Sequence, residues 1–408
     1  MRCRHCGAQL SLSFLDLGSA PPSNAYLAPA ALRAPEVWYP LRLLVCQSCW
    51  LVQTEDHAGR EALFTDDYAY FSSFSSSWLA HAKAYVEAMR RRFDLGPASL
   101  VSEIAANDGY LLQYVKQAGI PCYGVEPTAS TAGAARRLGI DIVERFFGAE
   151  LAAELASQGR RVDLVAANNV LAHVPDINDF VSGFTALLKP QGVATFEFPH
   201  LLRMIRENQF DTAYHEHYSY LSLTAVRRIF EANGLAVFDV EEHPTHGGSL
   251  RVFAQRQDEG RHATTARVAD VLQREVDAGM ASTAGYTPFQ QAADKVKNDF
   301  MAFLIDAKRQ GKTVGAYGAA AKGNTLMNYA GVRPDLLPFV VDRNPAKQHK
   351  FMPGSRVPIV DEDHLRAAKP DYVVLLPWNL KHELVQQLDY VRGWGGRFVT
   401  AVPVLEIV

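Results

Sequence analysis

The sequence lacks the long apolar runs and the charge imbalance that characterise several large classes of protein. No apolar run reaches the roughly 20 residues that a membrane-spanning helix needs, and the N-terminus lacks the apolar segment of a signal peptide. Lysine and arginine number 41 against 44 acidic residues, so there is no basic excess to attract nucleic acid or an anionic membrane. We therefore expect a cytoplasmic protein that binds neither. No motif indicates its oligomeric state.

Cysteine is also scarce, but its placement is informative. The chain has 408 residues, too many for one core, so two or three domains are expected. Four of its five cysteines form two C-x-x-C pairs, Cys3 with Cys6 and Cys46 with Cys49. In a reducing compartment such pairs favour a metal over disulfides. Four thiolates leave no open coordination position, so we expect a structural zinc site, with free thiols as the alternative.

The G-x-G-x-x-G fingerprint is absent from the first α/β unit. Residues 97 to about 200 alternate strands and helices, as in an open, doubly wound sheet with its site at the carboxyl ends of the strands. The first turn holds one glycine, Gly109, after Asn107 and Asp108, which disfavours close approach of a pyrophosphate. Glu126 ends the second strand, where this fold places a carboxylate against ribose hydroxyls. S-adenosylmethionine fits this pattern better than NAD, the alternative.

A second α/β unit begins near residue 312. Gly315 in its first strand, with Gly318 and Gly323 in the turn that enters the next helix, would free backbone amides at a helix N-terminus to bind phosphate. Their spacing departs from G-x-G-x-x-G, so close packing of helix against strand explains these glycines equally well. Two helical segments, about 262–281 and 287–310, would connect the units, and 234–239 and 250–254 alternate like edge strands.

The densest group of titratable side chains lies in Thr212-Ala-Tyr-His-Glu-His-Tyr-Ser-Tyr220. Two imidazoles, one carboxylate and three phenols fall within seven of these residues. Imidazole can accept and return a proton near neutral pH, and a phenol can donate to an oxyanion that forms during reaction. We therefore expect the chemistry here, although a polar loop with surface histidines would have the same composition.

Five motifs occur together and in order: the four cysteines, Glu103–Leu112, Tyr214–Tyr220, His246–Arg251 and Gly315–Gly323. In this combination the whole chain resembles the S-adenosylmethionine-dependent sugar C-methyltransferases of deoxysugar biosynthesis. The resemblance implies an α/β protein with a small zinc-binding domain (1–70), a central doubly wound methyltransferase domain (71–260) and a C-terminal Rossmann-like domain (261–408). It also implies methylation of a ring carbon, usually C3, of a nucleotide-linked 4-keto-6-deoxy sugar, most often the thymidine diphosphate form.

The implied chemistry needs a base beside the ketone and a donor to the enolate oxygen. By its match to the family motif, His217 is the expected general base. Tyr214 would contact the sugar or its enolate oxygen, and Glu216 would orient the base or bind sugar hydroxyls.

The resemblance also assigns further site residues. Tyr68 or Tyr70 would close the site from the N-terminal side, and His173 would approach the same cavity unless it is only a packed histidine. The methyl donor would be held by Glu103, Asn107, Gly109, Glu126 and Asn168. The nucleotide sugar would be held by His246, Gly315, Gly318, Lys322, Gly323 and Lys350.

Two other functions fit the sequence less well. The chain could be an NAD-dependent nucleotide-sugar dehydrogenase or epimerase, or a nucleotide-sugar binder without catalysis. The sequence does not distinguish C3 from C5 as the target, the substituent at C3, or thymine from another base.

Overall fold

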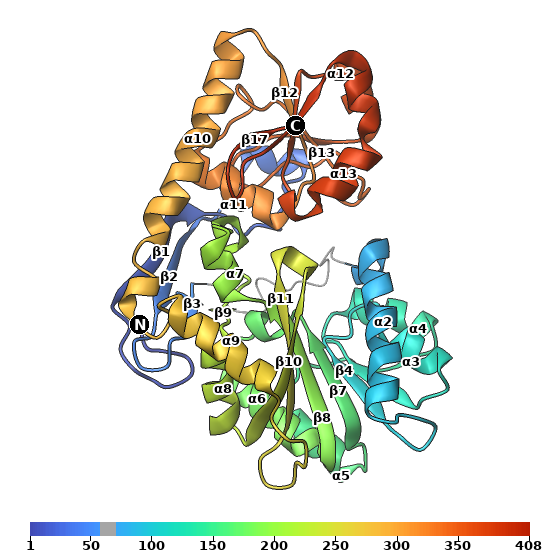
Figure 1. Cartoon of the computed structure of the whole chain (residues 1–408). Coiled ribbons are helices and arrows are strands. Elements are labelled where there is room, and N and C mark those ends of the chain that lie inside the picture. The colour runs from blue at the N-terminus through green and yellow to red at the C-terminus, as the bar shows by residue number, and fades with distance from the viewer. Residues whose placement is uncertain (58–70) are drawn as a thin grey trace.

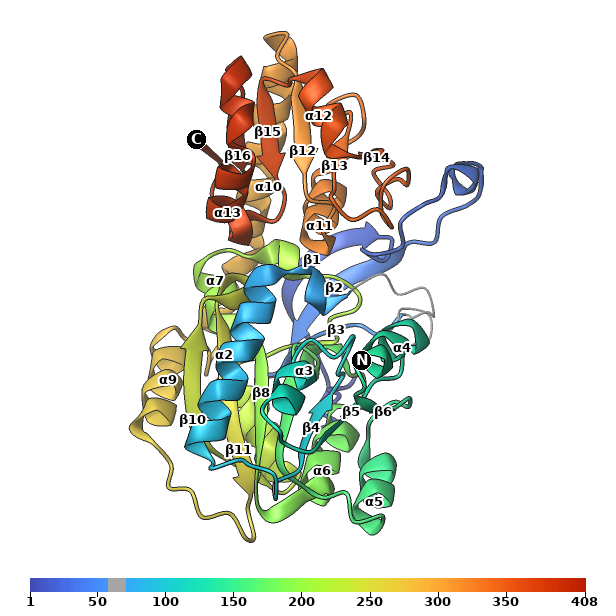
Figure 2. The same cartoon turned by 90° about the vertical axis from the view of Figure 1, so that its right-hand side faces the viewer.

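The computed structural model describes residues 1–57 and 71–408, whose strands form three separate sheets (Figure 1). The C-terminal sheet lies above the central sheet in that view. The N-terminal strands lie beside and between the two, as the turned view in Figure 2 shows. Tyr68 and Tyr70 lie outside the described residues. Among the described helices, none combines the length and the apolar character needed to cross a membrane.

The N-terminal sheet is antiparallel and takes its last strand from far along the chain. Its order is β1 (Leu12–Ala20), β2 (Tyr39–Val45), β3 (Val52–Thr54) and β9 (Ser219–Tyr220). β9 pairs with β3 through Val52 opposite Tyr220 and Gln53 opposite Ser219. The N-terminal unit is therefore joined directly to the stretch in which the sequence predicts the chemistry.

The central sheet has seven strands, of which five are joined to one another by parallel pairing. Its order is β10 (Leu235–His243), β11 (Ser249–Arg256), β8 (Leu188–Pro199), β7 (Val162–Asn168), β4 (Val101–Ile104), β5 (Cys122–Val125) and β6 (Asp141–Val143). β11 runs antiparallel between β10 and β8, so the prediction of two edge strands is correct for β10 and wrong for β11. Strand alternation alone cannot reveal this, because a second partner changes the hydrogen bonds and not the side-chain pattern.

Helices cover both faces of the central sheet, which explains why its inner strands are nearly continuous apolar runs. One face carries α5 (Ala149–Ser157), α6 (Ile177–Leu187) and α8 (Leu223–Ala232). The other carries α2 (Ser76–Arg92), α3 (Leu112–Gln117) and α4 (Ala129–Arg137). The remaining elements of this unit are η2 (Ser72–Phe74), η3 (Leu171–His173), α7 (Leu201–Arg206), η4 (Phe210–Thr212), η5 (Thr245–Gly247) and α9 (Ala266–Asp277).

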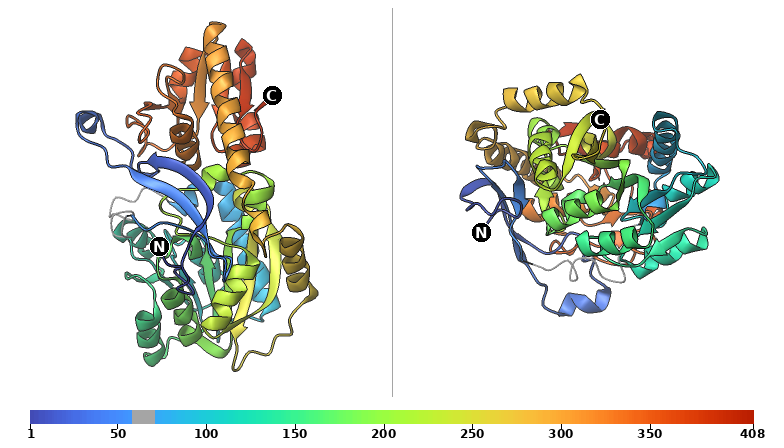
Figure 3. Two further views of the ribbon diagram at one scale, coloured as in Figure 1. Left: turned by 90° about the vertical axis from the view of Figure 1, so that its left-hand side faces the viewer. Right: turned by 90° about the horizontal axis from the view of Figure 1, so that it is seen from below.

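The C-terminal sheet is a second, mainly parallel α/β unit. Its order is β14 (Ile359–Val360), β13 (Val340–Val341), β12 (Val314–Tyr317), β15 (Tyr372–Leu375), β16 (Arg397–Thr400) and β17 (Glu406–Ile407). The helices around it are α10 (Phe289–Arg309), α11 (Ala321–Ala330), α12 (Glu362–Ala368) and α13 (Lys381–Gln387), and the short helix η7 (Trp378–Leu380) precedes α13. The long helix α10 leads from the central unit to the C-terminal one (Figure 3), as expected for a connection between units.

Candidate active site

The four paired cysteines meet at the start of the N-terminal sheet. Their sulfur atoms all lie within 4.8 Å of one another, with 3.6 Å between Cys3 and Cys49 and 3.5 Å between Cys6 and Cys46. Thiolates on a tetrahedral zinc ion, each about 2.3 Å from the metal, lie about 3.8 Å apart, so the cluster fits zinc. Cys46 follows β2 directly and Cys49 lies three residues before β3. A metal held here would therefore fix the turn from which β3 starts.

β3 in turn holds residues 212–220, called the catalytic stretch here because the sequence predicts the chemistry there. The hydroxyl of Thr54 donates to the carbonyl oxygen of His217 at 3.0 Å, and its backbone N–H donates to the carbonyl of Tyr218 at 3.2 Å. The zinc cluster, β3 and His217 thus form one continuous structural connection, although 163 residues separate Thr54 from His217.

His217 is buried in a defined orientation. Its Nδ1 lies 3.1 Å from the carbonyl oxygen of Thr212, to which it donates, so the lone pair of the neutral ring is on Nε2. Burial lowers its pKa well below the usual value, with a further contribution from the neighbouring His173. The ring centre lies 3.9 Å from that of Tyr214 and 4.6 Å from that of His173. The imidazole is therefore neutral at working pH, as a base must be before it accepts a proton.

The two histidines of the stretch face different neighbours. His215 is buried against β2, with Nε2 3.3 Å from the carbonyl of Tyr39 and 3.2 Å from that of Pro40. Because both histidines are buried, the alternative of a polar loop with surface histidines is wrong. Only His217 contacts Tyr214 and His173, so the structure separates His215 from this group.

Glu216, between the two histidines in sequence, is also buried. Its carboxylate accepts hydrogen bonds from Asn24, and burial raises its pKa to about 7. The backbone carbonyl of Glu216 accepts from Nδ1 of His173 at 2.8 Å. Burial also lowers the pKa of His173 to about 4. His173 therefore lies beside the predicted base as expected, and its role stays a prediction.

The residues expected to hold the methyl donor follow three adjacent strands, β5, β4 and β7. Glu103 lies in β4, Asn107 and Gly109 form the next turn, Glu126 follows β5 and Asn168 ends β7. Gly109 has a φ of +81°, and a Cβ there would lie 2.6 Å from Ile140, so backbone and packing both require glycine. Their common position at the carboxyl ends of the strands agrees with the prediction.

Buried acceptors in this region are available to a ligand. Asp108 Oδ1, Asn168 Oδ1 and both carboxylate oxygens of Glu103 have no hydrogen-bond partner within the described residues. Glu126 accepts from the backbone N–H groups of Asn107 at 2.9 Å and Thr128 at 3.0 Å, which fixes its carboxylate at the strand end. A nucleoside with hydroxyl and amino donors matches these acceptors. The residues present therefore fit S-adenosylmethionine.

Replacing Glu126 by alanine is expected to weaken S-adenosylmethionine binding by at least about tenfold. Hydrogen bonds to a charged group are worth about 1.5–3 kcal/mol each, and the change also frees the loop amides that Glu126 now holds. Calorimetry on the purified variant measures this. Glu144→Ala, which removes an exposed carboxylate after β6, is the matched control and should bind normally. Unchanged affinity of Glu126→Ala would refute the assignment.

The glycines of the C-terminal turn are explained by packing. A Cβ on Gly315 would lie 2.6 Å from Phe339, one on Gly318 2.5 Å from Pro377, and one on Gly323 2.7 Å from Leu376. The amide of Ala319 is already bound by Asp342. These contacts support the packing alternative for the three glycines, and phosphate binding at the start of α11 stays a prediction.

The ammonium group of Lys322, at the start of α11, lies close to residues of the central unit. Its Nζ lies 3.4 Å from the carbonyl of His246 and 4.6 Å from the ring centre of Trp378. Burial lowers the pKa of Lys322, opposed by the charge of Asp211. Trp378 donates from Nε1 to Asp211 at 2.8 Å. Lys322 therefore lies at the junction of the two α/β units, beside η4 and the stretch that follows it.

His246 is the residue of the central unit that lies beside Lys322 at the junction. Its Nε2 lies 3.2 Å from Asn169 Nδ2, and burial lowers its pKa to about 4. Lys347 Nζ donates to the carbonyl of Ala319 at 2.9 Å, so this lysine lies at the same turn, and the assignment of Lys350 stays a prediction.

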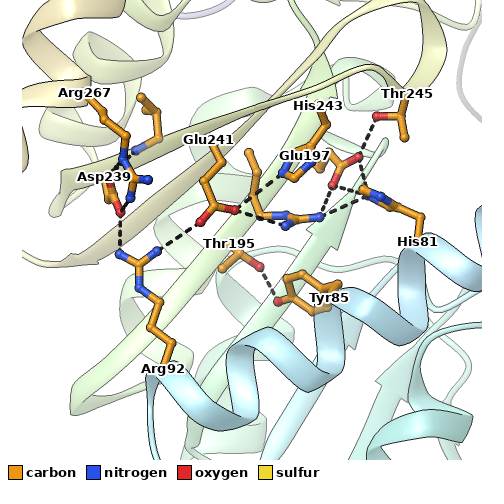
Figure 4. Close-up of polar contacts among 12 residues, drawn as sticks. His81, Tyr85, Arg92, Thr195, Glu197, Asp239, Glu241, His243, Thr245 and Arg267 are labelled. Carbon is orange, nitrogen blue, oxygen red and sulfur yellow. Dashed lines mark hydrogen bonds and ion pairs between the residues drawn. The ribbon is translucent and has the colours of Figure 1, made fainter.

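A buried ionic cluster fixes the turn that carries His246 (Figure 4). Glu197, fully buried in β8, accepts from Thr245 at 3.0 Å and from Arg251 at 2.8 Å, and lies 2.9 Å from His81. Burial alone would raise the pKa of Glu197, but the His81 hydrogen bond and the Arg251 charge lower it to about 2. Glu197 is therefore ionised and joins α2, β11 and η5.

Several residues of this region were not predicted from the sequence. They are Asn24, Thr54, Asp211, Glu197 and Trp378. Asp211 directly precedes the catalytic stretch, which was the one available signal. Asn24, Thr54 and Trp378 are distant in sequence and have no motif around them.

Comparison with known proteins identifies the class to which this fold and site belong. Three family models match: "Putative zinc binding domain" at residues 3–64, "Methyltransferase domain" at 82–240 and "C-methyltransferase C-terminal domain" at 244–403. The protein is an S-adenosylmethionine-dependent C-methyltransferase with a structural zinc site. The predicted fold class and both cofactors are thereby confirmed.

The full-length similarity is to a C-methyltransferase. The chain is 33% identical over 406 residues to the C-methyltransferase NovU of Streptomyces niveus, covering 100% of this chain and 96% of that protein. The chain therefore belongs to the family of C-methyltransferases to which NovU belongs, which sets aside the dehydrogenase, epimerase and non-catalytic alternatives.

More distant similarities cover part of the chain. A ubiquinone biosynthesis O-methyltransferase of Rhodopseudomonas palustris is 28% identical over 154 residues, 31% of this chain and 58% of that protein. The magnesium protoporphyrin IX methyltransferase of Synechocystis with bound S-adenosylmethionine is 16% identical, with a TM-score of 0.36, and covers 50% of this chain and 100% of that one.

Proposed function

We propose that the protein methylates a ring carbon, C3, of a nucleotide-linked 4-keto-6-deoxy sugar, the thymidine diphosphate form. The observation that carries this proposal is the buried His217, held neutral with its lone pair on Nε2 between Tyr214 and His173. A base in this state can remove a weakly acidic C–H beside a ketone. The full-length similarity to a C-methyltransferase supports carbon as the acceptor.

The proposed reaction uses the chain's own residues in a defined order. His217 Nε2 takes the proton from C3, the C–H electron pair moves into the C3–C4 bond, and the keto oxygen becomes the enolate oxygen. Tyr214 donates to that oxygen. S-adenosylmethionine, when bound, would supply the electrophilic methyl group: the enolate electron pair would form the C3–CH3 bond while the S–CH3 bond breaks, leaving S-adenosylhomocysteine. The proton leaves from His217 to solvent.

The substrate's nucleotide end is proposed to bind the C-terminal unit. Lys322 provides a positive charge at the junction, and the turn before α11 provides the start of a helix of ten residues. The sugar would then lie between this turn and His217, with His246 at its side.

The test of this function uses purified protein, S-adenosylmethionine and a panel of 4-keto nucleotide sugars. The expected product is heavier by one CH2 group, and reactions without either substrate are the controls. Methylation of none of these sugars, by protein that binds S-adenosylmethionine, would contradict the proposal.

Free thymidine diphosphate is expected to compete with the nucleotide sugar and not with S-adenosylmethionine. The two ligands are assigned to different α/β units, so their sites do not overlap. Steady-state inhibition patterns against each substrate measure this. Competition with the methyl donor instead would mean that the two units are assigned the wrong way round.

A further inference from the structure

The connection between β1 and β2 reaches the C-terminal unit and the catalytic stretch. In Figure 2 this blue segment extends outward between the central and C-terminal units. Leu27 pairs with Phe351 by backbone hydrogen bonds in both directions, and Glu36 accepts from the N–H of Gly354 at 2.6 Å. The connection is therefore attached to the C-terminal unit at more than one point along its length.

Asn24 is the residue of this connection that reaches the catalytic stretch. Its Nδ2 lies 2.9 Å from each carboxylate oxygen of Glu216. Tyr26, two residues on, donates to the carbonyl of Ala319 at 2.6 Å, and its hydroxyl lies 3.4 Å from Asn24 Oδ1. Asn24 is thus held between the turn before α11 and Glu216, with its NH2 group toward the carboxylate.

We propose that Asn24 is a positioning residue for methyl transfer, which fixes the Glu216 carboxylate and keeps it ionised while substrate binds. This inference rests on the proposed function, because it takes Glu216 as a residue that orients the base or binds sugar hydroxyls, the role that the family motif implies. It gives the N-terminal unit a direct part in the reaction, beyond holding zinc.

Within the part of the chain that the structure describes, Asn24 is the donor to the Glu216 carboxylate. Burial raises the pKa of Glu216 to about 7, and the Asn24 hydrogen bond is the interaction that opposes burial. Among the described residues, the titratable groups near Glu216 are the phenol of Tyr26, which has Lys347 and Asp342 beside it, the imidazole of His173 on the Glu216 carbonyl, and the adjacent His217. Both imidazoles have lowered pKa values, so neither supplies a positive charge near neutral pH. An ionised Glu216 thus relies on the Asn24 amide.

The test is the pH dependence of kcat for the Asn24→Ala enzyme. Loss of a hydrogen bond to the charged Glu216 carboxylate is expected to raise its pKa. The acid side of the kcat–pH profile should then move upward by about one pH unit. At pH 7 this lowers kcat about fivefold, and at pH 9 it leaves kcat within about twofold of wild type. Infrared difference spectra against Glu216→Gln, recorded across the same pH range, follow the carboxyl group without any substrate.

Glu36→Ala is the matched control, because it removes a contact of the same connection with the C-terminal unit without touching Glu216. The kcat–pH profile of Glu36→Ala should show no shift along the pH axis. In the Glu216→Gln background, Asn24→Ala should cost nothing further, since the two residues act as one unit. If Asn24→Ala folds poorly, as judged by zinc content, Asn24→Asp keeps the size, removes the donor and should shift the limb further.

Two results would overturn the inference. One is an unshifted pH profile and an unshifted infrared titration in Asn24→Ala. The other is an equal loss of kcat at every pH in Asn24→Ala with no shift of the profile, which would show a purely structural role. Failure of the proposed function is distinguishable, because the wild-type protein would then methylate no 4-keto nucleotide sugar while the infrared titration could still be measured.

Discussion

Replacing His217 by asparagine is expected to lower the rate of methyl transfer by about 10²–10⁴ while both substrates still bind. Asparagine can keep a hydrogen bond to the Thr212 carbonyl but cannot accept the proton from the sugar. In heavy water without a methyl donor, wild-type enzyme should exchange the C3 hydrogen, and His217→Asn should not. Proton NMR of the sugar measures exchange, and mass spectrometry measures methylation.

Three further variants locate the base. Tyr214→Phe should bind normally and lose less activity, because it removes a donor and leaves the base. His215→Asn should be milder still, since its ring faces Tyr39 and Pro40. Near-normal turnover in His217→Asn, together with loss in His215→Asn or His173→Asn, would show that the site is assigned correctly and the base wrongly.

Replacing Cys46 by serine is expected to remove zinc, to lower the melting temperature by about 10 °C or more, and to reduce methyl transfer. Metal binding at a structural site is coupled to folding, and loss of a metal site belongs to the most destabilising changes. The activity should fall as well, because β3 starts three residues after the zinc ligand Cys49 and its residue Thr54 donates a hydrogen bond to the backbone carbonyl of His217. Metal analysis, calorimetric melting and turnover measure the three effects.

Cys122→Ser is the control for thiol loss without metal loss. Cys122 begins β5 in the central sheet and does not belong to the sulfur cluster. It should retain zinc and activity. A Cys46→Ser protein that contains no zinc but has wild-type turnover would refute the connection between the metal and the catalytic stretch.

The sequence predicts the parts of this molecule that local pattern determines. The C-x-x-C pairs, the buried strands and the position of Glu126 after β5 are set by residues close in sequence, and each lies where it was expected. The small residues before α11 were ambiguous for a physical reason: glycine is required by close packing and by phosphate binding alike. The contacts of Gly315, Gly318 and Gly323 with Phe339, Pro377 and Leu376 favour packing.

The residues that the sequence missed depend on tertiary structure. Asn24 lies in a proline-rich loop, and nothing in that composition indicates that its amide faces Glu216, 192 residues away. Trp378 and Asp211 likewise meet across the junction of two units. Burial of His215 and His217 could not be predicted either, because it depends on contacts with the distant strands β2 and β3, through Tyr39, Pro40 and Thr54.

The position of the transferred methyl group tests the central claim most directly. Carbon-13-labelled methyl from S-adenosylmethionine, followed by NMR of the nucleotide-sugar product, identifies the atom that receives it. We expect a methyl carbon bonded to C3, with the C3 hydrogen lost and C5 unchanged. A methyl group on oxygen, or on C5, would contradict it.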